Sequence, residues 1–473
     1  MPGHLARTER IGMTFWQDFY QSIKDPSWPD CDREEDFAKL PRPIRDECQQ
    51  VFGYQPGQFA RQPKFMHKPF PIRTATACQL KWNWSTIYLT TEHTASCHRT
   101  AHHRFDSDSF NFHNTTAKQA DRKRMLAGEW PERGCDYCKQ IETAGGQSDR
   151  LTNLDLPGMH APMELEQDPS AVIVTPRILE VYFDNTCNLK CLYCGPHFSS
   201  LWDAENIQHG LPAFAKSPNI DRNKQKMFEW LKANRQHLTN FNILGGEPLY
   251  QRELLECLDF FQQYPAANLS LQIFTNLNAK RSYLEHVVER VQDLIAHDCL
   301  RNFEVTASLD CWGAPAEYVR FPLDLDRWQS NFEYLLDHPN INLIVSSTVT
   351  PLTVVTLPDL IAKINQWNQV RPIYHYQNSV NFPSYLFIDI FGDIFQDDFQ
   401  RAIDLKPTET DEQRKSRDYL IGIARQSCSV GPNVKELAKL HDFLQDIDRR
   451  RDVSWRRTFP WLEEQFRKHE ILT

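Results

Sequence analysis

Six apolar, strand-like segments alternate with helical patterns from about residue 175 onward, and this alternation is what most constrains the fold. The expected strands are Ile178–Phe183, Asn240–Leu244, Leu269–Thr275, Phe303–Ser308, Asn342–Val349 and Tyr385–Ile390. The expected helices between them include Lys224–His237, Arg252–Tyr264, Arg281–His297 and Leu323–Leu336. Such β-then-α units predict an α/β fold in which helices cover a parallel sheet. In folds of this kind, ligands bind beyond the carboxyl ends of the strands.

The chain has 473 residues, enough for two to three domains. We expect a helical N-terminal extension at 1–70, a cysteine-rich module at 71–155, a linker at 156–174, the α/β domain at 175–395 and a helical region at 396–473. The cysteine-rich module contains a strand candidate at Trp84–Thr90. Further helices are expected at Thr14–Ile23, Glu34–Leu40, Pro43–Val51, Val434–Arg450 and Trp461–His469.

The composition is that of an ordinary globular protein, with 41% hydrophobic and 24% charged residues and a net charge of −9. No long basic segment predicts nucleic-acid binding, and a run of arginines near residue 450 is interpreted as a solvated helix face. No segment predicts a membrane span, and the N-terminus does not look like a signal peptide, so a cytoplasmic location is expected. The 13 cysteines are then metal ligands or reduced thiols. Inert or buried thiols are expected at Cys31, Cys48, Cys257, Cys299, Cys311 and Cys428.

Cys187, Cys191 and Cys194 stand in one short loop, directly after the first expected strand of the α/β domain. A closed metal site needs four protein ligands, so three thiolates leave one position free. In a [4Fe-4S] cluster, the iron without a protein ligand can bind a small molecule. A zinc site with another fourth donor, such as His197, remains the alternative at this point.

The run Gly245-Gly246-Glu247-Pro248 closes the second expected strand. Two glycines let the backbone approach a ligand closely, and a carboxylate accepts a hydrogen bond from an ammonium group. Alone, this run would predict only a turn. Because it lies at the end of a strand, downstream of the three cysteines, we also consider it a candidate ligand-binding turn.

Together these residues resemble the radical S-adenosylmethionine (radical SAM) superfamily, with Tyr193 at the aromatic position before the third cysteine. The resemblance implies a partial (β/α)6 barrel in which Cys187, Cys191 and Cys194 hold a [4Fe-4S] cluster. It implies that SAM binds the open iron through its amino and carboxylate groups, and that its reductive cleavage makes a 5′-deoxyadenosyl radical that abstracts hydrogen from a substrate. Tyr193 is expected near the adenine, and the segment Gly245–Pro248 at the methionyl ammonium.

Other strand ends fit the same superfamily less specifically. Ser308 is a candidate hydrogen-bond donor to the ribose or carboxylate of SAM. Arg320 is a candidate to bind the SAM carboxylate through two parallel hydrogen bonds. The alternatives are a structural serine and a surface arginine. Asp310 is a candidate polar group on the substrate side.

An upstream set of four cysteines can complete a second metal site: Cys78, Cys97, Cys135 and Cys138. The order cysteine, strand, cysteine, C-x2-C resembles a twitch domain, a shortened relative of the SPASM auxiliary-cluster domain, although it lies N-terminal to the expected barrel. Structural zinc is the alternative, and His98, His102 and His103 are further candidate ligands.

The chain also resembles uncharacterised twitch-type radical SAM proteins of phages and marine bacteria. The matching positions are the run 25–29, the run 126–131, Glu142, Gly146, Ser148, Arg150 and the run 459–461.

The resemblance implies two [4Fe-4S] clusters, SAM and an external reductant such as flavodoxin or ferredoxin. A peptide or protein is the favoured substrate, and a small molecule such as a sugar is the alternative. A non-catalytic iron–sulfur or zinc protein is the rival from another class, but it has no need of the turn at Gly245–Pro248.

Overall fold

The computed structural model describes residues 71–72, 74–132, 134–143, 148, 150–151, 161–380, 382–428 and 430–472. The chain divides into two compact units, Met1–Met66 and His67–Thr473. All of the described residues belong to the second unit. The helices expected before residue 70, together with Cys31 and Cys48, lie outside the described residues.

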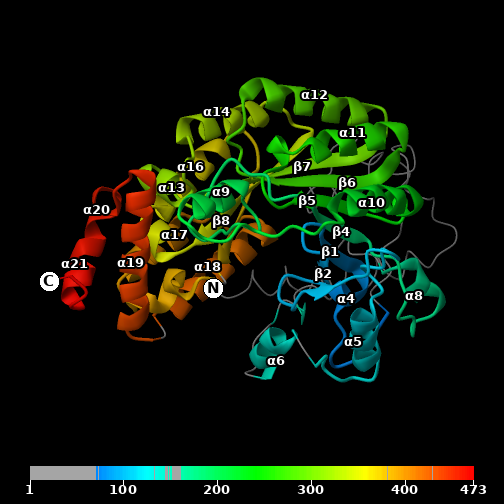
Figure 1. Cartoon of the computed structure of the whole chain (residues 1–473), viewed down its shortest axis with the longest axis horizontal. Helices are drawn as coiled ribbons and strands as arrows, with labels where there is room; N and C mark the ends of the chain where they lie inside the picture. The colour runs from blue at the N-terminus through cyan, green and yellow to red at the C-terminus, as the bar shows by residue number, and fades with distance from the viewer. Residues whose placement is uncertain are drawn as a thin grey trace, which may run out of the picture. The chain divides into compact units, whose positions relative to one another are not determined.

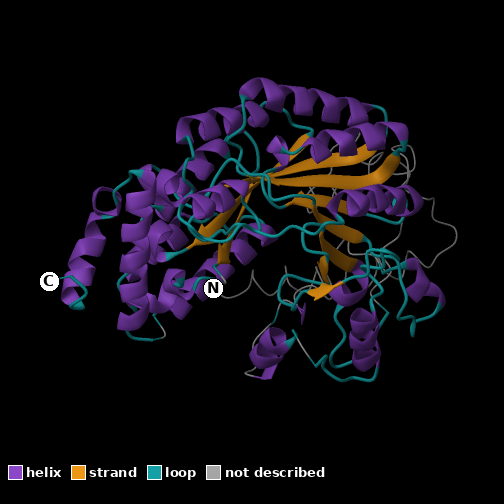
Figure 2. Ribbon diagram, viewed as in Figure 1, coloured by secondary structure: helices purple, strands orange, loops and turns teal. Residues whose placement is uncertain are grey.

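In the described part of the chain, nine strands form one sheet in the order β3-β2-β1-β4-β5-β6-β7-β8-β9 (Figures 1 and 2). Strands β4 to β9 are parallel neighbours in chain order, as the alternating pattern predicts. Strand β1 pairs parallel with β4, and β2 and β3 add an antiparallel edge. The strands are β1 Trp84–Tyr88, β2 His93–Ala95, β3 His103–Arg104, β4 Ile178–Tyr182, β5 Asn240–Leu244, β6 Ala266–Thr275, β7 Leu300–Ser308, β8 Ile341–Val349 and β9 Tyr374–Ser379.

Helices connect the parallel strands and cover the convex face of the sheet (Figure 1). The covering helices are α10 Ile220–Asn234, α11 Arg252–Gln263, α12 Arg281–Ala296, α14 Leu325–Leu336 and α16 Leu357–Trp367. Three shorter helices, α9 Ser200–Gln208, α13 Ala314–Val319 and α15 Pro351–Val354, pack with the C-terminal helices. The N-terminal module adds α4 Gln79–Asn83, α5 Thr116–Leu126, α6 Asp136–Thr143 and α8 Met163–Gln167, the last within the expected linker. The C-terminal region is helical as predicted, with α17 Gln396–Leu405, α18 Asp411–Ser427, α19 Val434–Arg451, α20 Trp455–Thr458 and α21 Pro460–Lys468.

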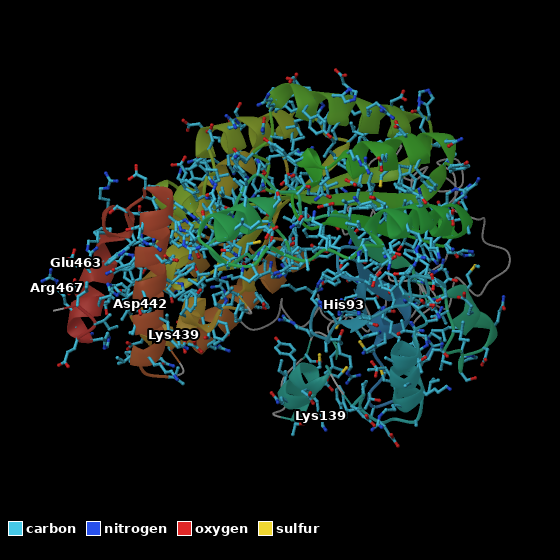
Figure 3. The ribbon with its side chains drawn as sticks, viewed as in Figure 1. His93, Lys139, Lys439, Asp442, Glu463 and Arg467 are labelled. Carbon is cyan, nitrogen blue, oxygen red and sulfur yellow. The ribbon has the colours of Figure 1, made fainter. Side chains whose placement is uncertain are left out.

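The two faces of the sheet differ in chemistry because side chains alternate along each strand. On β4 and β5, Leu179, Val181, Phe241 and Ile243 belong to the main hydrophobic core, together with residues of α10, α11, α12 and α14. The intervening positions face the opposite side, the inner face, and many of them are polar. Figure 3 draws the described side chains on the ribbon and labels His93 of β2 and Lys139 of α6 in the N-terminal module.

The sheet curls so that its distant parallel strands approach each other. Strands β4 and β9 are separated by four strands in the sheet order. Nevertheless, burial raises the pKa of Tyr182 on β4, and Tyr376 on β9 raises it further. Groups on strands so far apart in a flat sheet would not affect one another, so the arrangement is that of a partial (β/α)6 barrel.

One of the expected strands is wrong. The segment predicted as a strand at Tyr385–Ile390 forms two 3₁₀ turns, η3 Ser384–Leu386 and η4 Ile388–Phe391. Its apolar residues pack into the core of the C-terminal helices instead of a sheet. The sixth parallel strand is β9, whose Tyr-His-Tyr-Gln-Asn-Ser sequence is polar because its buried positions, His375 and Gln377, join a hydrogen-bonded network.

Candidate functional site

The loop that carries Cys187, Cys191 and Cys194 follows β4, at the carboxyl edge of the parallel strands. Backbone and side-chain hydrogen bonds fix this loop. The Cys187 N–H donates to Ser200 Oγ at 3.1 Å, and Trp202 Nε1 donates to the Cys191 carbonyl at 2.8 Å. The Asn276 amide, at the end of β6, donates toward Cys187 Sγ at 3.9 Å. The three cysteines therefore occupy one defined loop above the barrel.

The three thiols affect one another electrostatically. Burial is the main cause that raises the pKa of Cys187, and Cys191, Glu247 and Cys194 raise it further. Burial raises the pKa of Cys194 to about 12, and Cys191 again contributes. Buried thiols that destabilise each other's thiolates are ready to lose protons only when a cation or cluster binds them.

Among the described residues, no three His, Cys, Asp or Glu side chains converge closely enough to hold a single metal ion. Thiolates are the usual ligands of iron–sulfur clusters, in which three cysteines bind three different irons and do not converge on a single ion.

The turn at Gly245 and Gly246 packs directly against the beginning of the cysteine loop. Both glycines have positive φ angles, +81° and +57°. A Cβ on Gly245 would lie less than 3.0 Å from the Tyr182 ring, and one on Gly246 less than 3.0 Å from the Thr186 carbonyl oxygen. Only glycine fits these two positions, because a side chain is excluded both by backbone conformation and by space.

Hydrogen bonds join the same two segments. The Glu247 N–H donates to the Thr186 carbonyl at 2.8 Å. The Gln251 amide donates to the carbonyls of Gly245 at 2.7 Å, and of Asp184 and Thr186 at 3.2 Å each. Pro248 is buried and begins the 3₁₀ turn η2, Pro248–Tyr250. The two sequence motifs, more than 50 residues apart, form one structural unit.

The Glu247 carboxylate is buried and holds the ends of β5 and β6 together. It accepts hydrogen bonds from the Leu249 N–H at 2.9 Å, from Thr275 Oγ1 at 2.6 Å and from the Asn276 N–H at 2.6 Å. Burial raises the pKa of Glu247 to about 7, although these hydrogen bonds oppose the shift. Its predicted contact with a ligand ammonium remains a prediction.

Tyr193, Asp310 and Arg320 form a buried polar group beside the cysteine loop. The Asp310 carboxylate accepts hydrogen bonds from Tyr193 Oη at 2.6 Å, Arg320 Nε at 2.9 Å, Arg320 Nη2 at 2.7 Å and the Thr348 N–H at 2.8 Å. Asp310 is fully buried, so it supports this group and does not stand open to a substrate. Two N–H groups of Arg320 donate hydrogen bonds to Asp310. Ser308 is half-buried at the end of β7. The SAM contacts expected for Arg320 and Ser308 remain predictions.

The four upstream cysteines also come together. Cys78 is the N-cap of α4, and Cys97 and Cys135 pack against the small core that contains it. Burial raises the pKa of Cys78 to about 12, and Cys97 and Cys135 raise it further. Burial likewise raises the pKa of Cys135 to about 11, with contributions from Cys97 and Cys138. The described geometry therefore brings all four candidate ligands into electrostatic contact.

Three buried basic side chains lie in the same module, and two of them, Lys81 and Lys118, interact electrostatically with its cysteines. Lys81 forms an ion pair with Asp121 at 2.5 Å. The Lys118 ammonium donates to Ser85 Oγ, Thr94 Oγ1 and the Ala95 carbonyl. Arg122 donates to backbone carbonyls, Asn114 and His113. Burial lowers the pKa of Lys118, while Cys97 is among the groups that raise it. Among the described residues, Lys118 and Arg122 therefore have no carboxylate hydrogen-bond partner, and Lys81 has Asp121.

The motif Glu142, Ser148 and Arg150, noted in the sequence, supports the same module. Arg150 binds Glu142 through Nε at 2.9 Å, and Ser148 Oγ donates to the same carboxylate at 2.5 Å. Arg150 Nη1 donates to the Ala77 carbonyl at 2.6 Å, next to Cys78. The motif therefore ties α6, which contains Cys138, to the segment that contains Cys78.

The histidines considered as alternative ligands have other contacts. His98 lies 3.6 Å from Glu180 and edge-on to Trp84. His102 stacks on Tyr88, and His103 Nε2 lies 2.8 Å from Thr115 Oγ1. His197 packs on Phe198.

The remaining cysteines and the arginine run differ in how well they match expectation. Cys257, Cys299 and Cys311 are buried, in agreement with the expected buried or inert thiols; Cys428 is exposed, and its inertness stays a prediction. In the arginine run, Arg449 and Arg450 pair with Asp446, but Arg451 is buried against Glu205 and is not part of a solvated face.

No helix in the described ranges combines the length and apolar character needed to cross a membrane.

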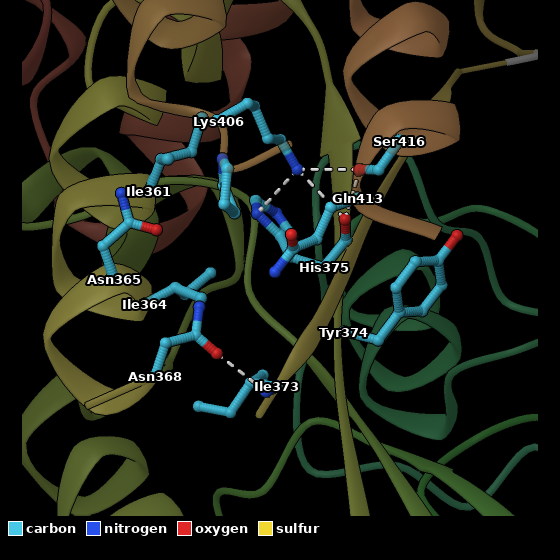
Figure 4. Close-up of a pocket in the computed structure, with 11 residues that line it drawn as sticks. Ile361, Ile364, Asn365, Asn368, Ile373, Tyr374, His375, Lys406, Gln413 and Ser416 are labelled. Atoms are coloured by element: carbon cyan, nitrogen blue, oxygen red, sulfur yellow. Dashed lines mark hydrogen bonds between the residues drawn. The ribbon is translucent and has the colours of Figure 1, made fainter. Parts of the chain in front are cut away.

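A pocket lies away from this site, on the helix-covered side of β9 between α16 and the α17–α18 region (Figure 4). Lys406 lies in it and contacts His375 and Ser416. None of the residues expected to bind a cofactor lines it.

The sequence matches no protein-family model and no curated protein. Similar solved structures include Streptococcus suis SuiB, at 13% identity and a TM-score of 0.35 over 76% of this chain and 72% of that chain. SuiB bound to precursor peptide SuiA matches at 12% identity and a TM-score of 0.33, over 64% and 62%. Native anSMEcpe with bound AdoMet matches at 16% identity and a TM-score of 0.32, over 48% of this chain and only 57% of that chain. Similarity at this level does not assign a function to this chain.

Proposed function

We propose that this chain is a radical SAM enzyme. One electron and SAM would give methionine and a 5′-deoxyadenosyl radical, which takes a hydrogen atom from the substrate and becomes 5′-deoxyadenosine. The main support for this proposal is that the Gly245–Gly246 turn packs closely against the loop that begins at Cys187 and is hydrogen-bonded to it. A non-catalytic metal protein needs the cysteines, but it has no use for this close, side-chain-free turn beside them.

The residues present fit a cluster and SAM. Cys187, Cys191 and Cys194 would hold the cluster, which supplies the electron when bound. Glu247 is a buried carboxylate close enough to Cys187 to affect its pKa. An ammonium group at this position would lower the raised pKa of Glu247 and keep the carboxylate ionised. Tyr193 would border the adenine; Ser308 and Arg320 remain candidate SAM contacts.

We further propose an auxiliary [4Fe-4S] cluster on Cys78, Cys97, Cys135 and Cys138. Charge balance supports it, because burying cations without anions is costly. Lys118 and Arg122 are buried without a carboxylate hydrogen-bond partner among the described residues, and Lys81 has only Asp121. Four thiolates around a cluster would supply the missing negative charge.

We propose flavodoxin or ferredoxin as the class of reductant, and a peptide or protein as the substrate. A sugar or another small molecule is the alternative.

The first test is the formation of 5′-deoxyadenosine. The anaerobically reconstituted chain, mixed with SAM and dithionite, is expected to produce it, measured by chromatography. Cys191→Ala should abolish the product, whereas Cys428→Ala, at an exposed cysteine, should retain it. Absence of the product from fully loaded native protein, with candidate peptides added, would refute the enzyme proposal.

The second test is the metal content. Two clusters imply about eight irons per chain, and a Cys135→Ala/Cys138→Ala variant should retain about four. Four irons with one zinc in the native protein would refute the auxiliary cluster and leave the radical SAM proposal standing.

A further inference from the structure

A row of polar side chains crosses the inner face of the barrel in strand register. Thr86 of β1 pairs with Glu180 of β4, Glu180 with Asn242 of β5, Asn242 with Gln272 of β6, and Gln272 with Glu304 of β7. We call these five residues the polar row. Sheets usually bury apolar residues, so a polar row across five neighbouring strands requires an explanation.

The polar row does not face the helices. The strand residues on either side of its members, such as Val181, Phe241 and Val305, lie in the helix-covered core. Because side chains alternate, the polar row points to the opposite side of the sheet. Tyr376 of β9 faces it across the barrel, since Glu304 and Glu180 both contribute to the raised pKa of that tyrosine.

Part of the polar row has no protein partner. Glu180 accepts a hydrogen bond from Thr86 Oγ1 at 2.7 Å and lies 3.6 Å from exposed His98. Glu304 forms no hydrogen bond or ion pair with any residue that the structure describes, although Arg301 affects it electrostatically. Asn242 is only 4% exposed, and its buried Oδ1 lacks a described partner. Buried acceptors are normally satisfied, so Asn242 Oδ1 indicates a missing donor, and the half-buried Glu304 carboxylate in the same row is open to one as well.

The position of the polar row suits a substrate. Glu180 and Asn242 each lie two residues before the ends of their strands, which is about 7 Å at the usual rise of a strand. The cysteine loop and the glycine turn begin beyond those ends. A molecule anchored at the polar row would extend toward them.

We propose that the polar row binds a cationic group of the substrate, an amine or guanidinium such as a lysine or arginine side chain of a peptide. Glu180 and Asn242, which are register neighbours, accept its N–H groups, and Glu304, two strands further along the row, adds a second negative charge. The oxygens of two carboxylates and of an amide are all acceptors, so the row favours a ligand that is positively charged and rich in N–H donors. This inference rests on the proposed function, whose substrate class it narrows.

The test measures binding of four probe peptides to the reconstituted full chain with SAM, by calorimetry. The probes are acetyl-Gly-X-Gly-amide with X as lysine, arginine, norleucine or glutamate. We expect the lysine or arginine peptide to bind at least about tenfold more tightly than the norleucine peptide, which corresponds to one ion pair of about 1.4 kcal/mol. Glu304→Gln and Glu180→Gln should each reduce this preference. Glu256→Gln, at a 44% exposed side chain on α11, should preserve it.

The outcomes separate this inference from the proposed function. SAM binding checks that each variant is folded, and 5′-deoxyadenosine is measured in the same samples. Formation of 5′-deoxyadenosine without any preference for cationic peptides, or with no measurable peptide binding, overturns the inference alone. A preference that survives Glu304→Gln and Glu180→Gln also overturns it. Absence of 5′-deoxyadenosine from loaded protein overturns the proposed function, whatever the peptides do.

Discussion

Single residues join the two sequence motifs of the candidate site. Gly246 lies where a Cβ would overlap the Thr186 carbonyl, one residue before Cys187. Glu247 and Gln251 then bond the same turn to the loop and to the next strand. The cysteine loop therefore depends on residues that do not bind a metal.

Gly246→Ala should be strongly destabilising. The φ angle of +57° costs a non-glycine residue about 1–2 kcal/mol, and the overlap with backbone adds more, so we expect a loss of about 3 kcal/mol or more. Gly210→Ala is the matched control, because Gly210 has φ +76° but no atom within 4 Å of its would-be Cβ. Urea unfolding compares them; equal losses for the two variants would contradict the close-packing argument.

Glu304 should make stability depend on pH. Burial raises its pKa from the ordinary 4.5 to about 7, with Arg301 opposing the shift. Between these values the folded chain holds a proton that the unfolded chain releases, so this group favours folding less and less as pH rises. Glu304→Gln cannot ionise, and its stability relative to the native chain should rise by up to about 3 kcal/mol between pH 4.5 and pH 8. Urea unfolding of the apo forms at both pH values measures this, and an unchanged difference would contradict it.

At the scale of elements, the last turn of α19 holds the cysteine loop in place. Arg451 is buried, binds the Glu205 carboxylate of α9 and donates to the Lys190 carbonyl at 2.9 Å. Lys190 also binds Glu205 and lies immediately before Cys191. A helix near the end of the sequence thus supports the loop of the candidate cluster.

Arg451→Ala should remove one of the two basic side chains that pair with the buried Glu205 carboxylate and leave Lys190 to balance its charge. We expect a loss of about 3–5 kcal/mol and weaker retention of iron, measured by unfolding and by iron content after gel filtration. Arg449→Ala, on the same helix but 67% exposed and paired with Asp446, should change stability by no more than about 0.5 kcal/mol. Similar effects of the two substitutions would mean that α19 does not brace the loop.

At the scale of the whole described unit, the cysteine-rich module shares its sheet with the barrel. Strand β1 pairs with β4 along its full length, from Trp84 with Ile178 to Tyr88 with Tyr182. Ile87 is fully buried in the same core as the barrel strands. The two cysteine groups, Cys78–Cys138 and Cys187–Cys194, are therefore attached to neighbouring strands.

This continuity predicts cooperative unfolding of the module and the barrel. Ile87→Ala should cost about 2–5 kcal/mol and should speed amide exchange in both β1 and β4, measured by hydrogen–deuterium exchange. Ile173→Ala, at a 63% exposed side chain, is the control and should have little effect. Faster exchange confined to β1 would show that the two regions unfold separately.

Much of this architecture is specified by local sequence patterns. The strand at Asn240–Leu244 is predicted with its observed bounds, because a short apolar run between turn residues specifies it locally. The helices Arg252–Gln263 and Arg281–Ala296 are predicted within one residue, since their apolar stripes have the helical period. The two motifs are recognisable because glycine and cysteine have few substitutes at such positions.

The alternation of strands and helices, the cysteine sets and the glycine turn could all be read from the sequence, since periodicity and residue type are local properties. Three features became visible only in the tertiary structure. The sixth parallel strand is the polar β9 and not Tyr385–Ile390. Asp310 is buried against Arg320, and Glu180, Asn242 and Glu304 belong to one row across the sheet. These features depend on which strands pair and which faces meet. Such pairings are made between residues far apart in the chain, where no local pattern specifies the partner.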